Sequence, residues 1–215
     1  MKSRLLVLTY YKVAEKVGGF SLNFISFEAG AAYYKKTGIS LPDDALEHAK
    51  QSDATLLACM GMPSIRYPDG REIAPQLELR EKLDLFAGVR PVKTLPGLPL
   101  PLQDERAKNL DFVLIRESTE GLFASRSNFT IKGEGADEAA FDTQKISRKG
   151  CERLFDFAFD FAKRRKHKGY VGKVTCVDKA NVLGSFYFMR QIFDQIASKH
   201  TDIEADHVYV DAAAL

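Results

Sequence analysis

The run Val174-Thr-Cys-Val-Asp-Lys-Ala-Asn181 decides the fold that this sequence predicts. Its first four residues are apolar or β-branched and indicate a strand, which ends near Lys179. Apolar residues then recur at helical spacing through 182–196, and a short second strand is predicted at 207–210. A strand, a helix and a strand in this order are typical of two parallel strands joined by a crossover helix.

The same alternation extends toward the N-terminus. It predicts an α/β fold with a mostly parallel sheet and helices on both faces. Binding sites in such sheets lie at the carboxyl ends of strands, where Arg116, Lys179 and Asp211 are placed. The further strands are expected at 5–8, 22–27, 54–60, 89–94 and 112–116, and the further helices at 10–17, 43–49, 77–86 and 151–162.

Two features depart from this regular pattern. Residues 123–141 show a loose two-residue period around a turn at Gly133-Glu-Gly135, which predicts a projecting β hairpin arm. The helices at 151–162 and 182–196 have wider apolar faces than a surface helix needs. A dimer interface and a shared central core explain those faces equally well.

Composition excludes several classes of function. The chain has 215 residues, 45% of them hydrophobic, and a net charge of +2, which argues against a general polyanion binder. No apolar run approaches the roughly 18 residues of a membrane span. The basic run at 163–168 fits a solvated helix end, where cations complement the dipole, better than a nucleic-acid site.

Cysteines and histidines give no metal or disulfide pattern. Cys59, Cys151 and Cys176 are dispersed in apolar segments, which predicts buried, reduced thiols and a cytoplasmic protein. His200 and His207 lie near acidic residues without metal-ligand spacing, so a solvated surface is the simpler interpretation.

Arg80, Arg90 and Arg116 are the candidate anion-binding residues. Several guanidinium groups can hold a di- or tricarboxylate through paired hydrogen bonds. Each arginine alone has a simpler explanation, such as a solvated helix charge for Arg80 or a pair with Glu117 for Arg116. Lys179 follows a buried strand and could act as a general base, although a pair with Asp178 is the plain alternative.

Four motifs resemble the β-decarboxylating dehydrogenases, the family of isopropylmalate, isocitrate, homoisocitrate and tartrate dehydrogenases. They occur in the family's order from about residue 22 to the end. The motifs are Glu78-Leu-Arg-Glu-Lys-Leu-Asp-Leu-Phe-Ala-Gly-Val-Arg-Pro91, Ile115-Arg-Glu-Ser-Thr-Glu-Gly121, Val177-Asp-Lys-Ala-Asn-Val182 and Tyr209-Val-Asp-Ala-Ala213.

The resemblance implies a role for each candidate. The three arginines would hold the carboxylates of a 2-hydroxy dicarboxylate. Lys179 would take the proton of the 2-hydroxyl, directly or through water, during hydride transfer to NAD or NADP. Asp211 would bind Mg²⁺ or Mn²⁺, and Asn181 would lie near the nicotinamide ribose. Lys179 and Asp211 would complete a partner's site, which implies a homodimer or a dimer with a complete subunit, and no nucleic-acid or membrane partner.

The sequence departs from the family pattern in three places. The family's G-D-G-I-G-P-E-type loop after the first strand is missing, since Thr9 runs directly into Tyr10. Phe123 stands where the family usually has a tyrosine that donates a proton to the enolate. The chain ends before the G-D-x-x-S-D aspartates and the adenosine-binding segment. These departures predict an incomplete, isopropylmalate-dehydrogenase-like, non-Rossmann fold.

Two functions follow from the resemblance. One is a metal- and NAD(P)-dependent dehydrogenase, with residues 1–86 as a partial cofactor-side domain and 87–215 as a substrate and dimerisation domain that stops early. The alternative is a catalytically inactive fragment or a dimerising subunit. Gln76 and Leu77 lie where the family reads the substrate's variable group, and the polar Gln76 argues mildly against a purely aliphatic group.

Overall fold

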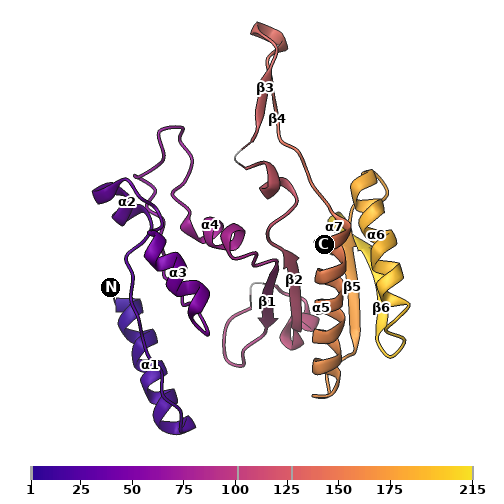
Figure 1. Cartoon of the computed structure of the whole chain (residues 1–215). Helices are drawn as coiled ribbons and strands as arrows, with labels where there is room; N and C mark the ends of the chain where they lie inside the picture. Colours follow the sequence, from indigo (N-terminus) through magenta and orange to yellow (C-terminus); the bar gives the residue numbers. More distant parts are fainter. Residues whose placement is uncertain (1, 101, 127, 215) are drawn as a thin grey trace. The chain divides into compact units, whose positions relative to one another are not determined.

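The computed structural model describes residues 2–100, 102–126 and 128–214. The chain divides into two compact units, Met1–Leu83 and Asp84–Leu215, and each is described by itself (Figure 1). The domain roles expected for 1–86 and 87–215 stay a prediction. None of the helices in the described ranges has the length and apolar character that a membrane crossing requires.

The first unit begins with a long helix where a strand was expected. Helix α1 spans Lys2–Gly18, so the strand prediction at 5–8 was wrong. No glycine or proline separates residues 5–8 from the helix predicted at 10–17, and leucine is a strong helix former. Because extending a helix is far easier than nucleating one, the helix continues back through these residues.

Three shorter helices complete the first unit: α2 (Ala31–Thr37), α3 (Asp43–Gln51) and α4 (Pro75–Lys82). Helix α3 begins as predicted, with Asp43 and Asp44 in its first turn. Its buried Ala45 and Leu46 pack with Leu41 and with Leu79 of α4. This small cluster holds the helix that carries Arg80.

The predictions of strands at 22–27 and 54–60 were wrong. The described residues of the first unit contain no strand. Leu56 and Leu57 are 59% and 45% exposed, whereas a strand buried on both faces was expected. An apolar run forms a strand only where a neighbouring strand takes its N–H and C=O groups. Cys59 lies in this segment and is exposed, so its predicted burial was also wrong.

The described residues of the second unit form three two-stranded sheets. Strands β1 (Ala87–Lys93) and β2 (Asp111–Glu117) are antiparallel, with Arg90 opposite Leu114 and Gly88 opposite Arg116. Strands β5 (Lys173–Asp178) and β6 (Glu204–Tyr209) are parallel, as the sequence predicts, with Asp178 opposite Tyr209. The described part of the unit is therefore mixed α/β. One of its three sheets is parallel and two are antiparallel, so the prediction of a mostly parallel sheet was wrong for these strands.

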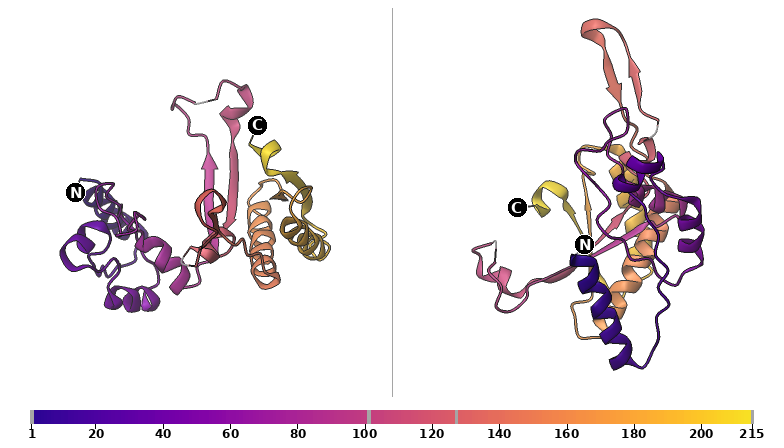
Figure 2. Two further views of the ribbon diagram at one scale, coloured as in Figure 1. Left: turned by 90° about the horizontal axis from the view of Figure 1, so that it is seen from above. Right: turned by 90° about the vertical axis from the view of Figure 1, so that its left-hand side faces the viewer.

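The projecting arm is confirmed as a hairpin. Strands β3 (Thr130–Lys132) and β4 (Ala139–Phe141) pair antiparallel, and Figures 1 and 2 show the hairpin extending away from the rest of its unit. Short 3₁₀ helices η1 (Glu105–Asn109), η2 (Leu122–Ser125) and η3 (Gly135–Asp137) lie in the connecting segments.

Helices α5 (Arg148–Lys166) and α6 (Gly184–Ala197) share one core with β5. The two helices lie side by side in Figures 1 and 2. Phe155, Phe159 and Phe193 are buried and in ring contact, and Cys151 and Cys176 are buried free thiols of the same core. A shared core thus accounts for much of the wide apolar faces. The dimer interface stays a prediction.

Of the two histidines expected at the solvated surface, His207 is exposed as predicted and His200 is partly buried. His200 stacks on Phe159, with ring centroids 4.7 Å apart and planes 4° from parallel, so it belongs to the edge of the core. His207 Nε2 lies 2.7 Å from Asp194 Oδ1. The basic run ends α5 as expected, and Arg165 of that run binds Asp111 at the start of β2.

Candidate functional site

Lys179 and Asp211 come together beyond the carboxyl ends of β5 and β6. Lys179 follows the last residue of β5, and Asp211 lies two residues after β6 in the short helix α7 (Val210–Ala213). The Lys179 ammonium donates to Asp211 Oδ1 at 2.6 Å. This hydrogen bond holds the pKa of the Asp211 carboxyl below its usual range. The parallel pairing of two strands therefore places a cation and a carboxylate 32 residues apart in direct contact.

Asp178 forms an ion pair with Arg190, not with Lys179 as the sequence suggested. Arg190 of α6 donates to both of its carboxylate oxygens, at 2.8 and 2.7 Å. Burial alone would raise the pKa of Asp178, but the hydrogen bonds from Arg190 and from the Ala180 N–H lower it. The pair between Lys179 and Asp178 does not form, and Lys179 is directed to Asp211 instead.

Asn181 lies in the exposed turn that follows β5. The Lys179 carbonyl accepts from the backbone N–H groups of Val182 and Leu183, which shapes this turn. Asn181 is therefore on the same turn as Lys179, two residues away. Its expected place beside a nicotinamide ribose stays a prediction.

Arg90 and Arg116 lie on one face of the β1–β2 ribbon. Arg90 is opposite Leu114, and Arg116 is the next residue of β2 on that face. Such diagonal neighbours are about 7–8 Å apart, close enough for two long side chains to hold one small dianion. Both arginines are exposed. Arg80 is in α4 of the first unit, so the structure brings together two of the three predicted arginines.

Arg116 is in contact with an aromatic ring rather than with Glu117. Its guanidinium carbon lies 5.2 Å from the centroid of the Phe123 ring. Glu117 instead binds the backbone and hydroxyl of Thr119. The expected plain explanation, an Arg116–Glu117 ion pair, is not what the structure contains. The Phe123 ring favours one placement of the guanidinium by a cation–π contact.

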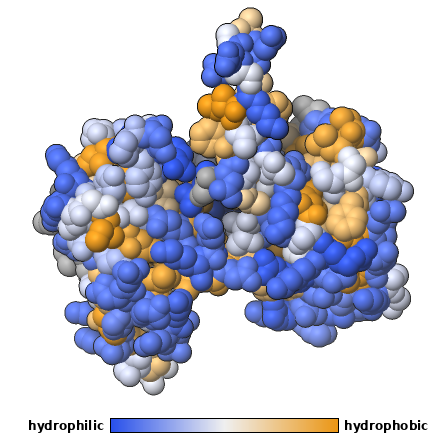
Figure 3. All heavy atoms as spheres, turned by 45° about the horizontal axis from the view of Figure 1, so that its top comes forward, coloured by the Kyte–Doolittle hydropathy of each residue, from blue (hydrophilic) through white to orange (hydrophobic). Residues whose placement is uncertain are grey.

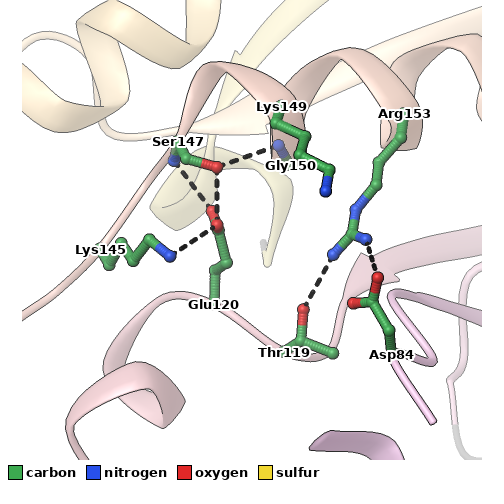
Figure 4. A pocket seen from close by; sticks show the side chains of 8 residues that line it. All are labelled: Asp84, Thr119, Glu120, Lys145, Ser147, Lys149, Gly150 and Arg153. Atoms are coloured by element: carbon green, nitrogen blue, oxygen red, sulfur yellow. Dashed lines mark hydrogen bonds and ion pairs between the residues drawn. The ribbon is translucent and has the colours of Figure 1, made fainter.

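A polar cavity of about 300 Å³ is lined in part by Thr119 and Glu120, which follow Arg116 closely in the chain. Figure 4 shows Glu120 reaching into it toward the start of α5. Glu120 accepts from the Ser147 N–H at 2.8 Å and from the Ser147 hydroxyl at 2.6 Å. Burial alone would raise the pKa of Glu120, but these bonds and Lys145 lower it. The residues lining the cavity are Asp84, Thr119, Glu120, Lys145, Ser147, Lys149, Gly150 and Arg153.

The side chains that line the cavity form a hydrogen-bond network around the carboxylate of Glu120. Glu120 occupies the N-terminal end of α5, where a negative charge is favoured by the helix dipole. Ser147 caps the helix by accepting from the Gly150 N–H. Arg153 donates to Asp84 at 2.6 Å and to Thr119 at 3.2 Å, which ties the start of β1 to α5 (Figure 4). These contacts hold the Arg116 segment in place.

The residues that support these two arrangements, Arg190, Ser147 and Glu120, were not predicted from the sequence. Arg190 lies 12 residues after Asp178 and has no local pattern that links the two. Ser147 could have been found, because serine directly before an apolar helical run is a common N-cap signal. Glu120 lies inside the motif Ile115–Gly121, but its contacts depend on Ser147, which is 27 residues away.

Asp211 is the one metal ligand that the sequence predicts. Within residues 2–100, 102–126 and 128–214, no group of three or more His, Cys, Asp or Glu side chains is arranged to hold a metal ion. Mg²⁺ and Mn²⁺ prefer several oxygen ligands. The described residues therefore do not fit a complete site for either cation, and Asp211 supplies at most one ligand.

Comparison with known proteins gives a consistent family. The family model described as isocitrate/isopropylmalate dehydrogenase matches residues 1–215. The 3-isopropylmalate/3-methylmalate dehydrogenase of Methanocaldococcus jannaschii is 38% identical over 200 residues, covering 90% of this chain and 53% of that protein. The 3-isopropylmalate dehydrogenase of Prochlorococcus marinus strain NATL2A is 37% identical over 203 residues, covering 92% and 54%.

Solved structures agree on the fold. The isocitrate dehydrogenase of Methylococcus capsulatus superposes with a TM-score of 0.71 at 29% identity, over 91% of this chain and 54% of that one. A β-decarboxylating dehydrogenase of Thermococcus kodakarensis gives a TM-score of 0.57 at 26% identity, over 89% and 50%. These similarities confirm the expected α/β fold. The chain spans about half the length of the curated relatives it matches.

Proposed function

This chain belongs to the isocitrate/isopropylmalate dehydrogenase family, and from that premise we propose that it serves an NAD(P)-dependent oxidative decarboxylation of a 2-hydroxy dicarboxylate. The observation that carries the proposal is the contact between Lys179 and Asp211 at the ends of two parallel strands. A proton-transferring amine and an oxygen ligand side by side suit the oxidation of an alcohol to a ketone.

Each candidate residue has a proposed task. Arg90 and Arg116, with Arg80 from the first unit, bind the substrate carboxylates through charge-assisted hydrogen bonds. Lys179 accepts the proton of the 2-hydroxyl, directly or through one water. An ammonium has no lone pair, so Lys179 must give up a proton before it can act as this base. Asn181 lies near the cofactor's ribose.

The metal and the dimer are part of the same proposal. Asp211 would contribute one oxygen ligand to Mg²⁺ or Mn²⁺, and the described residues alone would not complete the ligand set. Lys179 and Asp211 face the site of a partner subunit in the proposed homodimer. Exposed apolar side chains just before α6 and in its first turns support such a partner, since Val182 and Tyr187 are 67% and 55% exposed.

A second candidate is a subunit that is inactive alone and acts when paired with a complete one. Exposed apolar residues of the β1–β2 face favour it, because Phe112 and Leu114 are 46% and 44% exposed. Figure 3 shows apolar side chains, in orange, exposed at several places on the surface. Contiguous exposed apolar surface is typical of association sites.

A turnover assay with variants separates these candidates. The chain is mixed with Mn²⁺, NAD or NADP, and malate, tartrate, isocitrate or 3-isopropylmalate, and reduced cofactor is followed by absorbance. Replacing Lys179 by Met should lower turnover by about 10²-fold or more, the usual contribution of a general base. Replacing Lys173 by Met is the matched control, since this lysine begins the same strand and binds Glu204 and Asp206.

Each outcome has a defined meaning. Equal turnover in the two lysine variants would rule out the proposed role of Lys179. Turnover that appears only after a complete family member is added would favour the paired subunit.

Gln76 is half-buried in α4, and its polar amide favours a polar variable group on the substrate. Oxidation of isopropylmalate far faster than malate, tartrate or isocitrate would contradict that preference.

A further inference from the structure

We propose that Arg190 is a positioning residue that ties the ends of β5 and β6 together and thereby sets the separation between Lys179 and Asp211. This inference rests on the proposed function, because it concerns how that site is held. Arg190 is on α6 and touches neither Lys179 nor Asp211 in any hydrogen bond of the structure's described residues. Its proposed effect on Lys179 and Asp211 passes through its contacts with Asp178 and Tyr209.

The first contact of Arg190 fixes the turn that carries Lys179. Its Nε and Nη2 atoms donate to the two carboxylate oxygens of Asp178, which is 1% exposed. The Asp178 Oδ1 atom also accepts from the Ala180 N–H at 2.9 Å. Asp178 and Ala180 flank Lys179 on either side. A paired Arg–carboxylate interaction specifies geometry as well as energy, so it restricts where the Lys179 side chain starts.

The second contact of Arg190 is with the neighbouring strand. Its guanidinium carbon lies 5.1 Å from the centroid of the Tyr209 ring. Tyr209 ends β6 and is directly opposite Asp178 in the parallel register. The Lys179 ammonium lies 6.0 Å from the same ring. One side chain of α6 therefore touches the final residue of each strand, and Asp211 follows Tyr209 by two residues.

The fold does not need Arg190 for its core. Cys176, Ile192 and Phe193 already join β5 to α6 through buried apolar contacts. A buried ion pair adds little stability compared with apolar packing of the same volume, and its best-attested use is to select one arrangement among several. An Arg–Asp pair at the end of a strand that leads into Lys179 fits that use.

The test measures the NMR signal of the Lys179 ammonium group. In the ¹⁵N-labelled chain, the ammonium groups of lysines held in ion pairs give ¹H–¹⁵N signals, and the Lys179→Arg variant assigns the signal of Lys179. We expect Arg190→Lys to shift or abolish this signal, because lysine retains the charge but lacks both the paired donors and the planar group that stacks on Tyr209.

Arg165 supplies a matched control. Its Nη2 atom donates to Asp111 Oδ1 at 2.8 Å, and its guanidinium lies 4.0 Å from the centroid of the Tyr170 ring. This is the same combination of arginine, aspartate and tyrosine at another place in the unit. Arg165→Lys should leave the Lys179 signal unchanged, as it does not touch the ends of β5 and β6.

The outcomes separate this inference from the proposed function. An unchanged Lys179 signal in Arg190→Lys, or an equal change in Arg165→Lys, would overturn the positioning role. Neither result depends on turnover. A Lys179 signal that responds as expected, together with normal turnover of Lys179→Met, would instead refute the proposed function and leave the positioning role intact.

Discussion

Ser147→Ala should destabilise the second unit more than an ordinary surface substitution. The Ser147 hydroxyl makes two interactions, since it accepts from the Gly150 N–H at 3.0 Å and donates to Glu120 Oε1 at 2.6 Å. Loss of an N-cap costs about 1 kcal/mol of stability. Loss of a hydrogen bond to a charged acceptor costs about 1.5–3 kcal/mol.

The two losses should not add in full. They share one hydroxyl, and the Ser147 backbone N–H still donates to Glu120 Oε2 at 2.8 Å. We therefore expect the free energy of unfolding to fall by about 2–3 kcal/mol, since interactions within one network are coupled. Urea unfolding followed by far-UV circular dichroism measures the change, because α5 contributes much of the unit's helix.

Ser147→Thr is the control for this substitution. Threonine retains the hydroxyl and is also a good N-cap residue, so its loss of stability should stay below about 1 kcal/mol. A Ser147→Ala variant within about 0.5 kcal/mol of the parent protein, the range of neutral surface changes, would refute the network. The carboxylate of Glu120 would then gain nothing from the serine hydroxyl.

Three further predictions concern packing and pH. Gly150→Ala would place a Cβ atom 2.6 Å from Glu120 Oε2 and should cost about 1–3 kcal/mol of unfolding free energy, whereas Gly184→Ala meets nothing within 4 Å and should be neutral or stabilising. Phe193→Ala removes a side chain that is 1% exposed at the centre of the core, and urea unfolding should show a loss of about 3–5 kcal/mol. Because the folded-state pKa values of Glu120 and Asp178 lie below their ordinary 4.5 and 3.8, their ionised forms favour folding above those values, and the urea midpoint should fall as the pH drops below them. Glu120→Gln should flatten that pH dependence, and an unchanged slope would contradict the assignment.

The sequence predicted α5, β5, α6 and β6 of the second unit well, because their signals are local and mutually consistent, but it did not predict the antiparallel pairing of β1 with β2. Apolar residues at helical spacing predicted α5 and α6, and the short β-branched runs predicted β5 and β6 with their parallel pairing. The first unit was predicted less well. The runs at 22–27 and 54–60 suit strands, but strand formation depends on a neighbour to supply hydrogen bonds, and sequence periodicity alone does not reveal whether that neighbour exists.

The candidate site also has residues that the sequence predicted and one that it did not. Lys179 and Asp211 were predicted separately, each from its place after a strand, and their contact follows from the parallel pairing of β5 with β6. Arg190 could not be predicted, because its role depends on the direction in which α6 presents it to Asp178 and Tyr209. The residues proposed to carry the chemistry, Lys179 and Asp211, follow strand ends, where local sequence marks them. Residues that set their distances come from helices packed across the strands, and only the tertiary structure assigns them. If that division holds here, substitutions at Arg190 should change the geometry of the Lys179–Asp211 pair without changing which residues form it.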